Sequence, residues 1–182
     1  ERRLEEPVGP HFSVMTYNVN WGGGRPEKSV DIIRKIHTDI VYLQETNASW
    51  QDYLKLELSS LYPFMVFRET PNRAGGGLAF LSKTKGRQIA YIPSDNTFFD
   101  GWIMEFQTAA GPVEILNVHL HPAVNDAGSF GVSGYITSRE KRCQEIRRFY
   151  SGFTGKPPRL VVGDFNENDG GEAIQWLAQQ GM

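Results

Sequence analysis

The sequence predicts an α/β fold in which β-sheets are covered by helices on their outer faces. Three observations predict it. The chain opens with a strand, helix, strand, helix pattern, continues with five strand-like segments separated by turn residues, and then reads as helix, strand and short helix. With 182 residues the chain has the length of one domain with its own core, so we expect residues 1–182 to form a single domain.

The first strand and helix are predicted from periodicity. The segment "FSVMTYNV" alternates apolar residues with small polar ones, which is typical of a strand. The segment "RPEKSVDIIRKIH" places Pro26 near a helix start and Val30, Ile33 and Ile36 at helical spacing. We therefore expect these three apolar residues on the inner face of a helix.

The second strand and helix follow directly. The short apolar segment "DIVYLQE" predicts a buried strand. The segment "NASWQDYLKLELSSLY" predicts a helix whose N-terminus is capped by Asn47. Its expected inner stripe consists of Trp50, Leu54, Leu58 and Leu61.

After the second predicted helix, successive strand candidates replace the alternation of strands and helices, and helices return near the end of the chain. Five strand candidates favour an antiparallel meander: "YPFMVFR", "GGLAFLSK", "RQIAYIP", "WIMEFQTA" and "PVEILNVHL". A long polar loop, "HPAVNDAGSFGVSGYITSRE", leads to a helix around residues 138–150. Its expected inner face is marked by Cys143, Ile146 and Tyr150, together with Ile136 just before it. A strand, "PRLVVGD", and a short helix, "GEAIQWLAQQG", complete the pattern.

Net charge, apolar runs and the cysteine count limit the partners and the compartment that we expect for this protein. The net charge of −2 argues against binding to nucleic acid through bulk electrostatics, although a local basic cleft stays open. We expect a soluble protein, because the chain has no transmembrane-length apolar run and no signal-peptide core at its start; its compartment stays open. The lone Cys143 cannot form an internal disulfide, and we expect a core thiol rather than a nucleophile.

Four predicted strands end in polar clusters. In α/β proteins, strand ends are where binding and catalytic sites are built. If these ends converge, they gather carboxylates, carboxamides and imidazoles without a lysine. The clusters are Asn18 with Asn20, Gln44 with Glu45, His119 with His121, and Asp164 with Asn166.

This mixture suits a hard divalent cation and a phosphate. Mg²⁺ prefers oxygen ligands and is commonly held by one or two carboxylates together with substrate phosphate oxygens, and Mn²⁺ accepts the same oxygen donors. We expect Glu45 to be a direct metal ligand, with Asn18 adding a carbonyl oxygen or orienting a metal-bound water. Asn20, two residues on and so on the same side of an extended chain, would hold its neighbour or the phosphate.

The last polar cluster suggests the reacting groups. Asp164 would position or deprotonate an attacking water, and Asn166 would donate to a phosphoryl oxygen. Simpler interpretations stay open: "GDFN" as a turn, Glu45 as a cap of the following helix, and "HLHP" as a surface pair. The agreement of residue type, order and position across four clusters favours the functional interpretation.

In this order the segments "TYNVNW", "DIVYLQE", "GGLAFLSK", "NVHLHP" and "LVVGDFNEND" resemble the endonuclease/exonuclease/phosphatase superfamily of metal-dependent phosphoester hydrolases. The resemblance implies a two-sheet, four-layer α/β sandwich of the DNase I-like type. It further implies that Asn18 and Glu45 lie at the metal, His119 contacts the scissile phosphate, and Asp164 and Asn166 align water and phosphate. Asn20 occupies a slot where the family varies between Asn and Asp.

The chain departs from the family pattern at its C-terminal end. Members continue with a further strand pair and a Ser-Asp-His motif, whereas this chain stops at "QQGM" and has no histidine after His121. We therefore expect a C-terminally truncated domain. Its open sheet edge or exposed apolar face would be covered by a complementing fragment or a second copy.

The resemblance implies in-line attack of water on a phosphoester, assisted by Mg²⁺ or Mn²⁺. The substrate class stays open between nucleic acid, lipid head group and small phosphate ester, since the fold does not choose among them. Arg73, beside a glycine-rich turn, is the candidate phosphate-binding arginine, with Arg68, Trp102, Arg139 and Arg142 as further substrate contacts. The alternative is a non-catalytic module that binds metal or phosphate, or assembles, without hydrolysis.

Overall fold

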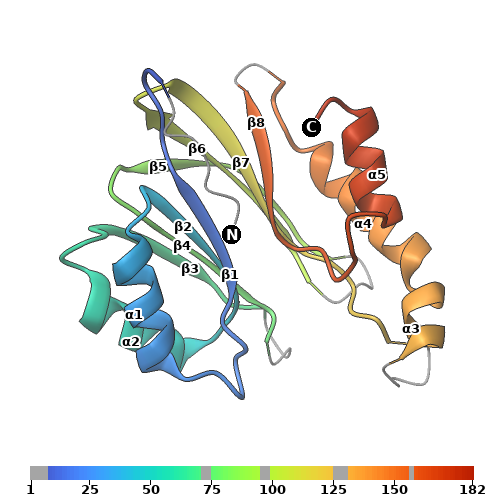
Figure 1. The fold of residues 1–182 in the computed structure, drawn as a ribbon, viewed down its shortest axis with the longest axis horizontal. Coiled ribbons are helices and arrows are strands. Elements are labelled where there is room, and N and C mark those ends of the chain that lie inside the picture. Colours follow the sequence, from blue (N-terminus) through green and yellow to red (C-terminus); the bar gives the residue numbers. More distant parts are fainter. Residues whose placement is uncertain (1–7, 71–74, 95–98, 125–130, 156–157) are drawn as a thin grey trace.

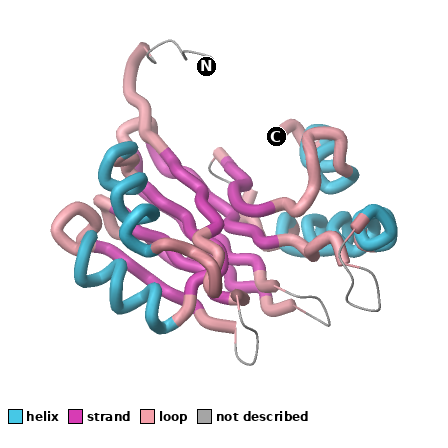
Figure 2. Tube along the Cα trace, turned by 60° about the horizontal axis from the view of Figure 1, so that its bottom comes forward, coloured by secondary structure: helices cyan, strands magenta, loops and turns pink. Residues whose placement is uncertain are grey.

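The computed structural model describes residues 8–70, 75–94, 99–124, 131–155 and 158–182. Two four-stranded sheets pack face to face, and helices cover the outer face of each sheet (Figure 1). Figure 2 shows the helices gathered on two opposite sides of the strands. The architecture is therefore a four-layer α/β sandwich, as the sequence predicts.

The first sheet has the strand order β1-β2-β4-β3. β1 and β2 are parallel, because the chain crosses between them through a helix, and the remaining pairs are antiparallel. The elements of this half are β1 (Val14–Asn18), α1 (Pro26–Ile36), β2 (Ile40–Thr46), α2 (Ala48–Leu58), β3 (Phe64–Arg68) and β4 (Gly77–Ser82).

The second sheet has the strand order β5-β6-β7-β8. β5, β6 and β7 form an antiparallel meander, and β8 runs parallel to β7 after a helical crossover. The elements are β5 (Gly86–Ile92), β6 (Gly101–Thr108), β7 (Gly111–His119), α3 (Val132–Thr137), α4 (Arg139–Tyr150), β8 (Arg159–Asp164) and α5 (Glu172–Gln179).

Three apolar clusters hold the layers together. An aromatic core fills the space between the sheets, where Phe80 packs against Trp102 and, edge to face, against Phe106. A second cluster packs α1 and α2 on the first sheet, and a third packs α4 and α5 on the second. Asn47 caps α2 as predicted, since its side chain accepts a hydrogen bond from the backbone N–H of Trp50.

The structure corrects several element predictions. The antiparallel run is not one meander, because β4 and β5 lie in different sheets and residues 83–85 carry the chain between them. Part of the expected polar loop forms the short helix α3. Two residues expected on inner faces are exposed, Ile36 at 54% and Ile136 at 58%. Ile36 is the last residue of α1, and Ile136 belongs to the short helix α3 rather than to α4. Cys143 is only half-buried.

Two edges of the sandwich matter for the site. β1 and β8 are the edge strands of their sheets, and each has a hydrogen-bonded strand on one side only within the described residues. Both belong to the parallel pairs, so the carboxyl ends of β1, β2, β7 and β8 provide the strand ends where the polar clusters lie. Within the described residues, every helix is too short or too polar to span a lipid bilayer.

Candidate active site

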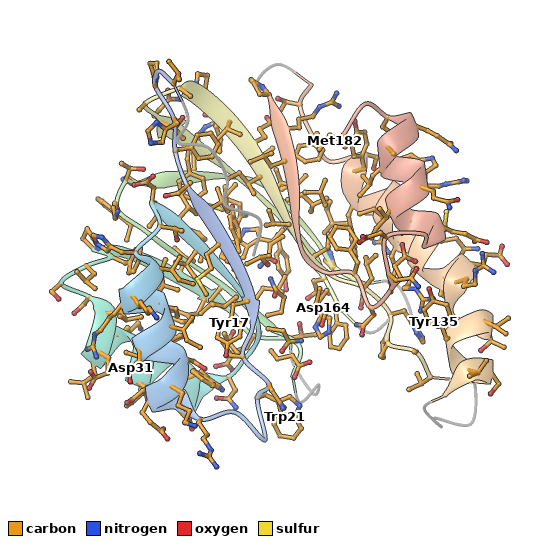
Figure 3. All side chains as sticks on the ribbon, in the orientation of Figure 1. Tyr17, Trp21, Asp31, Tyr135, Asp164 and Met182 are labelled. Carbon is orange, nitrogen blue, oxygen red and sulfur yellow. The ribbon has the colours of Figure 1, made fainter. Side chains whose placement is uncertain are left out.

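One amide joins the two sheets at the predicted polar clusters. Asn18, the last residue of β1, donates from Nδ2 to Glu45 Oε1 at 2.8 Å and to Asp164 Oδ2 at 2.9 Å. Figure 3 shows Asp164 at the boundary between the two halves of the sandwich. The structure thus brings together two acidic residues that lie far apart in the sequence and belong to different sheets.

The backbone of Glu45 is turned out of the regular strand ladder. Its φ is +61°, and the register between β2 and β4 shifts between Gln44 and Thr46, which marks a β-bulge. Gly77 pairs with Thr46 so closely that a Cβ at Gly77 would lie 2.1 Å from the Thr46 carbonyl oxygen. A non-glycine residue in this conformation costs of order 1–3 kcal/mol, and such strain clusters at functional sites.

Two asparagines of the clusters share this left-handed backbone. Asn20 has φ +52° and Asn166 has φ +50°. Each follows a side chain that caps its backbone N–H: Asn18 Oδ1 accepts from Asn20 at 2.9 Å, and Asp164 Oδ1 accepts from Asn166 at 2.9 Å. The expectation that residues two apart point the same way along an extended chain is therefore wrong, because these pairs form turns.

His119 completes the group from β7. Its side chain is 3% exposed, and Nε2 lies 3.7 Å from Glu45 Oε1 and 3.8 Å from Asp164 Oδ2. The ring stacks on Phe99 with a centroid separation of 3.7 Å, and Nδ1 has no hydrogen-bond partner among the described residues. Burial lowers the pKa of His119 below its usual 6.5, although the charges of Asp164 and Glu45 act against this.

The second histidine of the "HLHP" segment lies apart from this group. The backbone N–H of His121 donates to Glu145 Oε2 at 2.7 Å, and its Nδ1 lies 2.8 Å from the carbonyl oxygen of Pro122. Both His119 and His121 are buried, so the interpretation as a surface pair is wrong.

A buried amide pair links the sheets below the site. Gln44 Nε2 donates to Asn117 Oδ1 at 2.6 Å, and Asn117 Nδ2 donates to the Leu43 carbonyl oxygen at 3.2 Å. Asn117 is not among the site residues that the sequence predicts. Its signal is a polar residue inside an apolar strand, two positions before His119 and hence on the same face of β7.

The segment after Asp164 rests on a buried ion pair. Arg142 of α4 donates from Nε to Glu167 Oε2 at 3.2 Å, and both side chains are fully buried. Arg142 also donates to the carbonyl oxygens of Tyr135 and His121, while Glu167 accepts from the backbone N–H of Ile174 at 2.8 Å. Arg142 is therefore a structural residue rather than the substrate contact that its sequence position suggested.

The other expected substrate contacts are likewise engaged within the fold. Trp102 is 1% exposed in the core between the sheets. Arg68 lies over the Tyr91 and Trp102 rings, and Arg139 pairs with Glu172 at 2.9 Å. Arg73 lies outside the described residues.

A cavity of about 380 Å³ opens between the two edge strands at this site. Among the described residues no group of three or more His, Cys, Asp or Glu side chains has a metal-binding arrangement. The acidic residues of the cavity lining are Asp164, Glu167 and Asp169, while Glu45 meets Asp164 through the Asn18 amide. The cavity is lined by Thr16, Tyr17, Asn18, Gln44, Gly163, Asp164, Phe165, Glu167, Asp169 and Ile174.

The sequence matches a family profile over nearly its whole length. The profile of the Endonuclease/Exonuclease/phosphatase family matches residues 15–181. None of the curated proteins compared with the chain matches it.

Three solved structures illustrate the proteins that share this fold. A humanized D. rerio TDP2 with 14 mutations gives a TM-score of 0.65 at 17% identity, over 87% of this chain and 63% of that one. A β-hairpin deletion mutant of β toxin from Staphylococcus aureus gives a TM-score of 0.68 at 16% identity, over 93% of this chain and 72% of that one. Sphingomyelinase C from Streptomyces griseocarneus gives a TM-score of 0.63 at 17% identity, over 94% of this chain and 70% of that one.

These likenesses establish a DNase I-like α/β sandwich, as the sequence predicts. At identities of 16–17% they do not carry an activity from one protein to another. The chain spans 63% of the length of the D. rerio TDP2 that it matches.

Proposed function

The chain belongs to the endonuclease/exonuclease/phosphatase family, and we propose that it hydrolyses phosphoester bonds by activating water with the help of a divalent cation. Members of this family are generally dependent on divalent metals. The observation that carries the proposal is the Asn18 amide, which holds Glu45 and Asp164 from separate sheets at 2.8 and 2.9 Å.

The donor set fits a cation bound mainly by oxygen. Two carboxylates meet at one amide, and the adjoining cavity has no lysine or arginine among its described lining residues. Like charges this close oppose each other, and a divalent cation offsets that repulsion. Mg²⁺, with Mn²⁺ as the alternative, suits one or two carboxylates completed by water and substrate oxygens.

The residues of the site have separate proposed roles in binding the cation and the phosphate. Glu45 is the proposed direct ligand, and Asn18 orients both carboxylates through its Nδ2. Asn18 Oδ1 accepts from the Asn20 backbone N–H and keeps a second lone pair for the cation or a water bound to it. When bound, the cation neutralises charge on the phosphate and stabilises the leaving oxygen. Asn20 and Arg73 are the proposed phosphate contacts.

Proton movement is assigned to Asp164 and His119. Asp164 accepts a proton from the attacking water, whose oxygen bonds to phosphorus as the phosphorus–oxygen bond on the opposite side breaks. Neutral His119, with Nε2 facing the site, donates a hydrogen bond to a phosphate oxygen. Asn166 donates with the amide hydrogen that does not bind the Leu120 carbonyl oxygen.

The test uses bis-p-nitrophenyl phosphate and plasmid DNA with Mg²⁺, with Mn²⁺, and with a chelator. Asp164→Asn should lower turnover by roughly 10²- to 10⁴-fold without unfolding the protein, because it removes the proton acceptor. Glu45→Gln should raise the Mg²⁺ concentration needed for half-maximal activity. Asp31→Asn on the exposed face of α1 is the matched control, because that side chain is 75% exposed. Normal hydrolysis by the Asp164 variant would refute the assignment.

A second candidate is a non-catalytic module that assembles through an open edge. The observation favouring it is an apolar cavity of about 450 Å³ between β8 and α5, where Leu160 of the edge strand is 36% exposed. This candidate predicts Mn²⁺ binding, detected calorimetrically, without turnover of either substrate. It also predicts a concentration-dependent dimer in sedimentation velocity. A protein that stays monomeric, binds Mn²⁺ and hydrolyses phosphoesters would rule this candidate out.

A further inference from the structure

The imidazole ring of His119 is held by stacking rather than by a hydrogen bond. Phe99 lies against it with a centroid separation of 3.7 Å and an angle of 6° between the ring planes. A functional histidine is usually oriented through the ring nitrogen that faces away from the reaction, but His119 Nδ1 has no hydrogen-bond partner among the described residues. Nε2 lies 3.7 Å from Glu45 and 3.8 Å from Asp164, which is too far for a hydrogen bond. The direction of Nε2 therefore depends on where Phe99 lies.

Phe99 lies just outside the regular sheet. The ladder between β5 and β6 ends at the pair of Ile92 and Gly101, so within the described residues this strand pairing does not extend to Phe99. Gly101 is fixed by packing, since a Cβ there would lie 2.5 Å from Phe149 Cγ of α4. The two residues before Gly101 need other contacts to hold them beside His119.

The side chain of Asp100 supplies these contacts. It is buried, and its Oδ1 accepts a hydrogen bond from the backbone N–H of Ser94 at 2.7 Å. Oδ2 accepts from the Tyr91 hydroxyl and lies 3.0 Å from the Thr70 hydroxyl. Thr70 follows β3 of the first sheet, whereas Tyr91 belongs to β5 of the second. One carboxylate therefore ties the residue next to Phe99 to both halves of the sandwich.

The anchor at Tyr91 is itself well fixed. Burial raises the pKa of Tyr91 to about 12, and the hydrogen bond and charge of Asp100 act in the same direction. The phenol therefore stays protonated at neutral pH and donates to a carboxylate, which makes a stronger hydrogen bond than a neutral acceptor does. The Tyr91 ring also packs edge to face against Trp102 of the core between the sheets.

We propose that Asp100 is a positioning residue: by fixing residues 99–100 it keeps Phe99 against His119 and so directs Nε2 toward the phosphate. This role rests on the phosphoester hydrolysis proposed above, in which Nε2 donates to a phosphate oxygen. Asp100 does not line the cavity between the edge strands, so it acts through the His119 ring rather than on the substrate. Without Asp100 the ring loses its fixed direction, which weakens a hydrogen bond that matters most in the transition state.

A spectroscopic test measures the stack directly. The chain has four histidines, and His119→Gln assigns the His119 resonances in a proton–carbon NMR spectrum by removing them. The ring current of Phe99 should shift the imidazole C–H protons of His119 upfield, and Asp100→Ala and Phe99→Leu should each abolish that shift. Phe99→Tyr should retain it, because the aromatic face remains. Tyr62→Phe is the matched control, because it removes a buried hydroxyl bond to the Thr38 carbonyl oxygen in the cluster under α1 and α2.

The kinetic test uses bis-p-nitrophenyl phosphate with Mg²⁺. Asp100→Ala should lower kcat by about 5- to 100-fold with KM nearly unchanged, because a misdirected Nε2 loses an interaction of the transition state. Tyr91→Phe removes one donor and keeps the carboxylate, so it should lower kcat less. In a His119→Gln background, Asp100→Ala should lower kcat no further, because its effect passes through the ring.

The two measurements separate failure of this proposal from failure of the proposed hydrolysis. Unchanged His119 resonances in Asp100→Ala overturn the positioning role, whether or not any substrate is hydrolysed. Equal losses of kcat with and without His119 also overturn it, because Asp100 would then act by another route. If the wild type hydrolyses neither this ester nor plasmid DNA, the proposed function fails and the spectrum alone decides whether Asp100 positions His119. If Asp100→Ala does not fold, Tyr91→Phe supplies the same readouts, and an unchanged spectrum there overturns the role.

Discussion

The two sheets position their site residues by different physical means. In the first sheet the means is backbone shape: Glu45 lies at a bulge of β2 with φ +61°, and Gly77, paired with Thr46 beside it, leaves space for the Thr46 carbonyl oxygen. In the second sheet His119 and Asp164 end regular paired strands. The segment after Asp164 is then fixed by the buried pair of Arg142 and Glu167.

The difference determines what each half tolerates. A bulge packed against a glycine is sensitive to added volume, because a Cβ on Gly77 would clash with the Thr46 backbone, which cannot shift without loss of stability. A buried ion pair is sensitive to loss of one charge, because the remaining charge has no water to solvate it. Substitutions of volume and of charge should therefore damage different halves of the same site.

The largest expected effect comes from breaking the buried pair. Arg142→Met should destabilise the protein by about 3–5 kcal/mol, because it leaves the Glu167 carboxylate buried without its partner. The measurement is the midpoint and slope of urea unfolding. Arg142→Met combined with Glu167→Leu is the control, and it should recover much of the loss by removing both charges. A double variant no more stable than the single would show that charge is not the cause.

The next effect comes from adding volume at the bulge. Gly77→Ala should cost about 1–3 kcal/mol, since its Cβ would lie 2.1 Å from the Thr46 carbonyl oxygen. It should also lower turnover by displacing Glu45 from Asn18. Gly22→Ala is the matched control, because a Cβ there has nothing within 4 Å. Full activity and stability of the Gly77 variant would mean that the bulge does not place Glu45.

The sequence predicts the fold better than the geometry of the site. Strand and helix periods identify the elements, and the order of polar strand ends selects Asn18, Glu45, His119 and Asp164, which the structure brings together. The bulge at Glu45 leaves no local signal, because it depends on the register of β2 against β4.

Contacts between side chains that tertiary packing brings together are also not predicted by the sequence patterns. Phe99 stacks on His119 from a loop whose sequence gives no hint of this position. Arg142 looked like a surface arginine near a substrate, because an isolated helix pattern does not reveal that Glu167 lies beneath it. The turn conformations of Asn20 and Asn166 were missed because each follows directly on a strand, where extended geometry is the default expectation.

A smaller effect tests the link between the two halves. Asn117→Leu should cost about 1–3 kcal/mol, because it leaves the buried Gln44 amide short of a partner. Combined with Gln44→Leu, the two losses should fall short of additivity by about 0.5–1.5 kcal/mol, measured in a double-mutant cycle of urea unfolding. Full additivity would mean that the 2.6 Å contact contributes no coupling between the sheets.

The smallest expected effect lies at Asp39, next to β2, and is a change with pH. Burial alone would raise the pKa of Asp39, but hydrogen bonds from Ser13 and the hydrogen bond and charge of Lys83 outweigh it and hold the pKa below 3.8. A lowered folded-state pKa contributes stability that is present above the unfolded value and is lost as pH falls through the folded value.

The stability of the wild type should therefore decrease more steeply below about pH 3.8 than that of Asp39→Asn, which cannot titrate at this position. Thermal midpoints of the two proteins between pH 2.5 and 7 measure the difference. The change should be small because the Asp39 side chain is 44% exposed, and solvent screens its interaction with Lys83. Because these contacts lie apart from Asn18, Glu45 and Asp164, Asp39→Asn should leave turnover at neutral pH unchanged. Parallel pH profiles for the two proteins would show that Ser13 and Lys83 do not favour the ionised carboxylate.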